Sequence, residues 1–188
     1  MTRYDWTAIA ADLDTQGWAI LPRLLDAKAC DTTSALYDGG SGFRSHVVMA
    51  RYGFGRGEYR YFSYPLPPLV AELRETLYPY LVPIANRWHA RMGFGTRFPD
   101  GHADFVARCH ADGQARPTPL LLRYGPGDYN CLHQDLYGAH VFPLQVAVLL
   151  SAAFHLFIMY FFADWSLTGL TRLAEKGREM FSGDRVPP

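Results

Sequence analysis

The sequence has little cysteine, no excess of either charge and no N-terminal signal peptide pattern. Its three cysteines, Cys30, Cys109 and Cys131, are odd in number and widely spaced, which argues against a disulfide scaffold and favours a reducing, cytoplasmic location. Eighteen Lys and Arg balance 18 Asp and Glu, so the chain lacks the basic excess typical of nucleic-acid-binding domains. Acidic side chains stand near the start, where a signal peptide needs an apolar core.

What is present predicts one domain of the α+β class. The 188 residues are enough for a substantial core, and 15% of them are aromatic, which favours sheet packing or an aromatic-lined pocket. Helical and strand-like apolar periods both occur along the chain. We expect helices at residues 4–16, 26–37, 69–92 and 99–111, and strands at 18–21, 47–49, 59–64, 120–124 and 144–150. Two prolines, Pro79 and Pro83, should kink or divide the long third helix.

Three His-x-Asp spacings occur, and only one lies in a strand-like context. In an extended chain, side chains i and i+2 point to the same side, so an imidazole and a carboxylate at this spacing can bind one metal ion. In a helix they diverge by about 200°, which disfavours the two pairs within residues 102–112. His133 and Asp135 are therefore the predicted metal ligands, two of the three in a 2-His-1-carboxylate iron site. From spacing alone, an ordinary surface or core histidine stays open for His133.

The sequence around this pair contains three specific stretches, VVMARYGFGRGEYRYFSYPLP, RPTPLLLRYG and GDYNCLHQDLYGAHVFPLQVAVLLS. Together they resemble a bacterial family of 2-oxoglutarate- and Fe(II)-dependent oxygenases, over about residues 3–151. This prolyl-hydroxylase-like family is often labelled proline hydroxylase, and it has also been described as acting on damaged DNA. The resemblance implies a double-stranded β-helix (jelly-roll) core with N-terminal helices.

The resemblance also implies roles for individual residues. His133 and Asp135 would bind Fe(II), while Tyr124, Tyr129 and Asn130 would contact the co-substrate 2-oxoglutarate. A phenol can donate a charge-assisted hydrogen bond to a carboxylate of that acid, worth about 1.5–3 kcal/mol. Ascorbate is a candidate activator of such an enzyme.

A glycine-rich loop at residues 53–57 separates the two strands expected between residues 43 and 64. Its alternate glycines permit positive φ and a close backbone approach, but their spacing is not that of a phosphate-binding loop. The loop is a candidate substrate loop, with Arg51, Arg56 and Arg60 as anion donors and Tyr59 and Tyr61 as further contacts. A plain β-hairpin with solvated arginines is the open alternative.

The family pattern stops at Ser151. The expected distal histidine ligand, and the arginine for the far carboxylate of 2-oxoglutarate, are not found in matching positions. We therefore expect an oxygenase-like domain at residues 1–151 and a divergent, apolar, helical tail at 152–188 in place of the last strands. A frameshift or truncation near the codon of Ser151 would explain this break, impair activity and leave sheet edges open to self-association.

Two alternatives to an active oxygenase stay open. One is a non-catalytic remnant or binding protein, and the other is a zinc-binding module that uses Cys109, His110, Cys131 and His133. The apolar run 146–163 has the length of a membrane helix, but its start belongs to a predicted strand, so we expect no membrane span. Prolyl side chains, amino acids, small metabolites and damaged nucleobases are all candidate substrates, although the neutral charge disfavours DNA.

Overall fold

The computed structural model describes residues 1–132, 140–151 and 155–161. Contacts divide the chain into two units, Met1 with residues 22–164, and residues 2–21 with 165–188. The described part of the second unit contains helix α1 (Trp6–Gln16). The Asp5 carboxylate accepts hydrogen bonds from the first-turn N–H groups, and Gly17 ends the helix at φ 81°. This confirms the first predicted helix.

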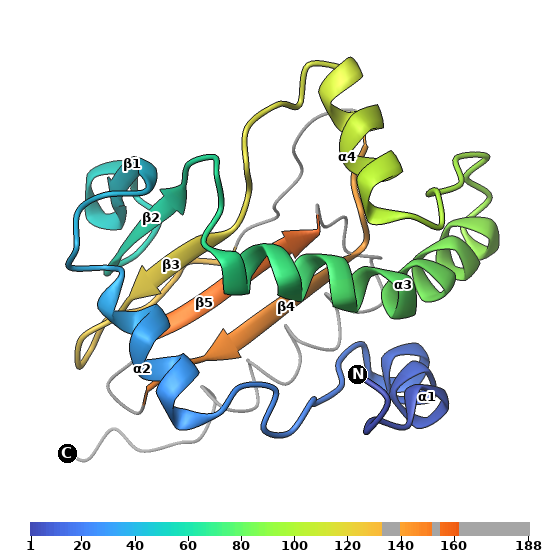
Figure 1. The fold of residues 1–188 in the computed structure, drawn as a ribbon, viewed down its shortest axis with the longest axis horizontal. Helices are drawn as coiled ribbons and strands as arrows, with labels where there is room; N and C mark the ends of the chain where they lie inside the picture. Colours follow the sequence, from blue (N-terminus) through green and yellow to red (C-terminus); the bar gives the residue numbers. More distant parts are fainter. Residues whose placement is uncertain (133–139, 152–154, 162–188) are drawn as a thin grey trace, which may run out of the picture. The chain divides into compact units, whose positions relative to one another are not determined.

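The first unit contains a five-stranded antiparallel sheet in the order β1-β2-β3-β5-β4 (Figure 1). Its strands are β1 (Phe43–Val48), β2 (Glu58–Phe62), β3 (Leu120–Arg123), β4 (Leu144–Leu149) and β5 (His155–Phe161). Its helices are α2 (Ala27–Ala35), α3 (Pro68–Arg91) and α4 (His102–Ala111). Helices together with an antiparallel sheet confirm the predicted α+β class.

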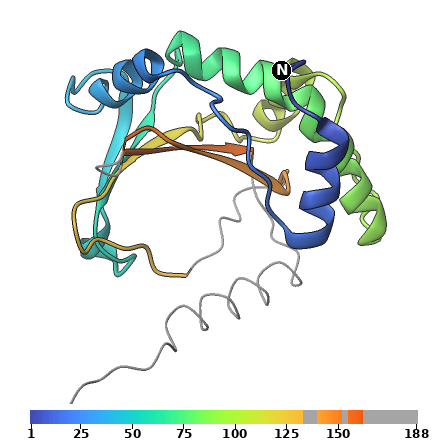
Figure 2. The ribbon, with the colours of Figure 1, turned by 90° about the horizontal axis from the view of Figure 1, so that it is seen from below.

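The two faces of this sheet differ in what covers them. Helices α2 and α3 lie on one face (Figure 2), where Phe62, Leu121 and Val148 are buried. The pairing registers place Ala147 and Leu149 on the opposite face, where both are exposed, Leu149 by 64%. We call these the covered face and the open face. Antiparallel sheets commonly bury one face and leave the other available.

Helix α3 supplies much of the core under the covered face. Its buried side chains recur at helical spacing and include Leu73, Leu77 and Leu81. Of the two effects expected from Pro79 and Pro83, a kink or a division, division does not occur, because α3 runs through both prolines. Both prolines are exposed, so water can bind the carbonyl groups that they leave without an N–H partner.

Two other expectations from the sequence are wrong. Residues 18–21 form no strand, because no described strand pairs with them. Residues 155–161, expected in a helical tail, form β5, which pairs with both β3 and β4. A short apolar run has no period that separates a strand from a buried helix, so hydrogen-bonded partners decide the outcome. The sheet thus continues past residue 151, and the helix expected near residues 164–182 lies outside the described residues.

None of the described helices is both long enough and apolar enough to cross a membrane. The apolar run 146–163 contributes to strands β4 and β5 instead of a helix. The membrane-helix alternative for this run is therefore wrong over its described part.

A buried histidine on α4 should make the fold sensitive to acid. His102 lies 5.4 Å from the Tyr78 ring, between centroids, and burial, with a smaller contribution from Arg74, lowers its pKa to about 4. The unfolded chain takes up this proton first, near pH 6.5. The free energy of unfolding should therefore fall as the pH drops from about 6.5 to about 4. Urea unfolding across this range should show that His102→Gln removes part of the fall.

The matched control is His110→Gln, because His110 is an exposed histidine on the same helix. If His102→Gln retains the whole acid sensitivity of the native chain, the buried imidazole is not its source.

Candidate functional site

The glycine-rich loop is paired, backbone to backbone, with the segment that precedes His133. The Arg56 N–H donates to the Tyr129 carbonyl at 2.7 Å, and the Tyr129 N–H donates back at 3.2 Å. One step further, the Cys131 N–H donates to the Phe54 carbonyl at 2.9 Å. The structure therefore brings Arg56 next to Tyr129, although 72 residues separate the two in the sequence.

Two glycines make this close approach possible. Gly55 has φ 116° and bridges Asn130, and a Cβ atom there would lie 2.3 Å from the Tyr129 carbonyl oxygen. Gly57 has φ 114°, and its Cβ would lie 2.6 Å from the Tyr124 ring. Any larger residue would force these segments apart, so the loop is more than a plain hairpin turn.

The open face next to this loop carries tyrosines. Tyr59, Tyr61 and Tyr124 pack against the buried Leu120 and Leu122. The rings of Tyr59 and Tyr61 meet edge to face, with centroids 5.5 Å apart. Three predicted site residues thus lie together on one face of β2 and β3.

The Tyr124 phenol is a proton donor over a wide pH range. Burial, with smaller contributions from Asp128 and Tyr59, raises its pKa to about 12. A phenol in this state can donate a hydrogen bond to a carboxylate, but it cannot act as a base near neutral pH.

Exposed aromatic and basic side chains surround the glycine-rich loop. Tyr52, Phe54 and Tyr129 are 63%, 47% and 54% exposed, and Arg51 and Arg56 are exposed as well. The Tyr52 and Phe54 rings stack with centroids 5.6 Å apart. We call these five residues the rim. No role was predicted for Tyr52 and Phe54, although aromatic residues alternate with arginine and glycine around them.

On the covered face, an ion-pair cluster holds the ends of β2 and β3 together. Glu58 lies directly opposite Arg123 and accepts from it at 2.8 Å, and His46 lies 2.6 Å from the same carboxylate. Burial alone would raise the pKa of Glu58, but the hydrogen bonds from His46 and Arg123 lower it overall. Arg60 lies 4.8 Å from the Tyr37 ring centroid on this face, so it is not the substrate-side anion donor that the sequence suggested.

The predicted iron ligands His133 and Asp135 lie outside the described residues. The described chain is fixed on both sides of them. The Cys131 N–H is hydrogen-bonded to the loop on one side. On the other side, the His140 N–H donates to the Gln114 side chain at 3.1 Å, and the His140 ring pairs with the Asp112 carboxylate. Among the described residues, no three His, Cys, Asp or Glu side chains gather as a metal site would require.

The other candidate ligands do not gather in the described residues. His102 packs on Tyr78 while Asp104 is exposed, as expected for a helical pair. Cys109 is buried in α4, whereas Cys131 is exposed and bonded to the loop at the far end of β2 and β3. The zinc module therefore has no support from the described residues.

Comparison with known families identifies the class of protein as an oxygenase. The match covers residues 57–157, which is more than half of the chain and includes the open face, and it continues past Ser151. The chain belongs to the Oxygenase-NA family, described as an oxygenase catalysing oxidative methylation of damaged DNA. This confirms the predicted oxygenase family, while turnover by this chain and its dependence on Fe(II) and 2-oxoglutarate stay predictions.

Two curated relatives from Mycobacterium tuberculosis, strains CDC 1551 / Oshkosh and H37Rv, are both described as uncharacterized proteins. Each is 51% identical to this chain over 90 residues, which cover 48% of the chain. The aligned part spans about 39% of the length of these relatives. No solved structure matches the chain.

Two glycine substitutions, one at a close contact and one in open space, test the pairing of the loop with residues 129–131. Gly55→Ala places a methyl group against the Tyr129 carbonyl, so it should cost about 2–4 kcal/mol and weaken the pairing. Gly53→Ala is the matched control, because Gly53 also has positive φ (71°) but has nothing within 4 Å of a Cβ, so it should cost about 1 kcal/mol. Urea unfolding gives the costs, and hydrogen exchange at the Arg56 and Cys131 amides reports the pairing. Equal rates of hydrogen exchange at these two amides in both variants would contradict a pairing that depends on Gly55.

Proposed function

We propose that this chain is the core of an Fe(II)- and 2-oxoglutarate-dependent oxygenase with a jelly-roll fold. His133 and Asp135 are the proposed iron ligands, and Tyr124, Tyr129 and Asn130 are the proposed contacts of 2-oxoglutarate. The observation that carries the proposal is the backbone pairing of the glycine-rich loop with residues 129–131 beside the open face. Two of the proposed co-substrate contacts, Tyr129 and Asn130, belong to the paired segment, which ends two positions before His133 in the sequence.

The donor set suits the metal. An imidazole and a carboxylate two residues apart are two of the ligands of a facial iron site, and no third ligand is assigned. When bound, Fe(II) supplies the activation of O2 that is coupled to oxidative decarboxylation of 2-oxoglutarate. Activation by ascorbate and a cytoplasmic location are further predictions.

The chain's own contribution is to hold and orient the co-substrate. The Tyr124 phenol keeps its proton and donates a hydrogen bond to a carboxylate of 2-oxoglutarate, which fixes the acid at one point. The rings of Tyr59 and Tyr61 cover Leu120 and Leu122 and keep water from these two side chains.

We propose damaged DNA as the primary substrate, in keeping with the family's description. The rim supports this class of substrate, because exposed aromatic rings stack on bases and neighbouring arginines bind phosphates. The net charge of zero weighed against DNA in the sequence, but the local charge at Arg51 and Arg56 is positive. A local basic patch on a neutral chain can still direct a nucleic acid to one place.

The direct test of function is turnover of a base-damaged single-stranded oligonucleotide. With Fe(II), 2-oxoglutarate and O2, the chain should release one succinate and one CO2 for each oxidised base. Retained oligonucleotide binding with no succinate would favour the alternative of a non-catalytic binding protein. Absence of both oligonucleotide binding and succinate release would contradict the proposed function.

Removal of either proposed ligand should weaken metal binding. His133→Ala and Asp135→Ala should each raise the dissociation constant for Fe(II) by at least about 10–100-fold, since even loss of a supporting contact can cost that much. Anaerobic calorimetry with Fe(II) measures the change. His46→Ala is the control, because His46 pairs with Glu58 on the covered face. Unchanged affinity in both ligand variants would rule out this iron site.

Loss of the Tyr124 hydroxyl should weaken co-substrate binding. Tyr124→Phe removes one charge-assisted hydrogen bond, so the dissociation constant of 2-oxoglutarate should rise about 10–100-fold. Because the pKa is about 12, the native affinity should not fall between about pH 7 and 10 through ionisation of this phenol. Tyr37→Phe is the matched control, since burial also raises the pKa of Tyr37 to about 12 and its ring lies on the covered face. An equal effect of both variants would contradict the assignment.

A further inference from the structure

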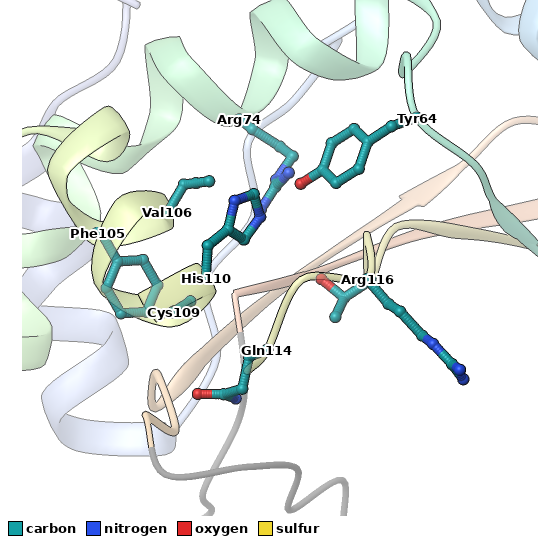
Figure 3. A pocket seen from close by; sticks show the side chains of 9 residues that line it. Tyr64, Arg74, Phe105, Val106, Cys109, His110, Gln114 and Arg116 are labelled. Atoms are coloured by element: carbon teal, nitrogen blue, oxygen red, sulfur yellow. The ribbon is translucent and has the colours of Figure 1, made fainter. Parts of the chain in front are cut away.

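A small pocket lies at the end of β2 and β3 opposite to the glycine-rich loop (Figure 3). Tyr64 follows β2, Thr118 precedes β3, and helices α3 and α4 contribute Arg74 and His110. From Glu58 to Phe62, β2 alone spans about 13 Å, so this pocket is separate from the proposed catalytic site. An inference about it does not rest on the proposed function.

The pocket contains a buried arginine that has no counter-charge among the described residues. Arg74 is only 5% exposed, and within residues 1–132, 140–151 and 155–161 its Nε atom meets no hydrogen-bond acceptor. No hydrogen bond or ion pair joins its side chain to the described part of the chain, and no Asp or Glu lines the pocket. A buried guanidinium without a counter-charge costs stability, and an anion bound beside it would offset that cost.

The side chains around Arg74 are suited to an oxyanion. Figure 3 shows the Tyr64 hydroxyl and the His110 ring directed toward the Arg74 guanidinium, whereas Arg116 points away. The Tyr64 and His110 rings lie edge to face, 6.0 Å apart between centroids. Both are exposed, so a ligand can reach the pocket from solvent.

We propose that Arg74, Tyr64 and His110 form a binding site for a phosphate group. The guanidinium fork can donate two parallel hydrogen bonds to one phosphate, and the Tyr64 hydroxyl can donate a third. The same chemistry occurs in free phosphate and in the backbone phosphate of a nucleic acid, and both sources are tested below.

Thermal unfolding of the whole chain tests the site with inorganic phosphate, against chloride at equal ionic strength. Saturating phosphate should raise the unfolding midpoint of the native chain by roughly 2–8 °C. Arg74→Met, which keeps the size of the side chain without its charge, should show no rise. Arg91→Met is the matched control, an exposed arginine of the same helix, and should respond as the native chain does. No phosphate-specific rise in the native chain, or an equal rise in Arg74→Met, would overturn the proposal.

A second variant serves if Arg74→Met fails to fold. Tyr64→Phe changes an exposed side chain and should raise the half-saturating phosphate concentration roughly 3–10-fold. An unchanged concentration in a folded Tyr64→Phe chain would overturn the assigned site.

Titration with an undamaged single-stranded oligonucleotide then identifies the source of the phosphate. Weaker oligonucleotide binding by Arg74→Met, but not by Arg91→Met, supports a backbone phosphate as the ligand. Equal oligonucleotide binding, together with the lost response to inorganic phosphate, supports free phosphate. Because these measurements need neither iron nor turnover, their failure is distinguishable from failure of the proposed oxygenase.

Discussion

The site depends on one backbone contact, the approach of Gly55 to Tyr129 and Asn130. This contact joins a loop after β1 to a segment after β3, and no side chain could fit between them. Backbone hydrogen bonds on both sides of Gly55 fix the relative positions of the loop and the segment. The rim, the open face and the approach to His133 therefore share one rigid junction, and a change in the loop alters all three together.

Side chains on the covered face of the sheet stabilise this junction. Glu58 and Arg123 face each other at the last register position of β2 and β3, next to Gly57 and Tyr124. A half-buried pair with two further partners, His46 and Asp38, resists fraying more than an isolated surface pair does. The tyrosines of the open face are thus positioned by charges on the other side of the same strands.

Local signals in the sequence predicted local structure well. Asp26 was expected to begin the second helix, and its carboxylate does accept the Ala29 N–H. The two strands expected between residues 43 and 64 are confirmed, because β1 pairs with β2. Tyr59, Tyr61 and Tyr124 were selected as site residues, and the structure places them together.

Features that depend on distant partners could not be predicted from the sequence. The β5 segment shows only an apolar run, and its strand character comes from pairing with β3 and β4. The contact of Gly55 with Asn130 joins residues 75 positions apart, and no local pattern encodes that separation. Arg74 could have been noticed in the sequence, because it stands four residues after Val70 on the apolar face of a helix, where a charged residue is unusual.

The fixed points at Cys131 and His140 have a consequence for the proposed iron site. Nine residue steps join them, so their separation cannot exceed about 30 Å. Backbone hydrogen bonds to the glycine-rich loop hold Cys131, while Asp112 and Gln114 hold His140. For the proposed ligands His133 and Asp135, folding has therefore already met the entropic cost of closing the loop between these two points, and coordination of iron would not have to meet it again.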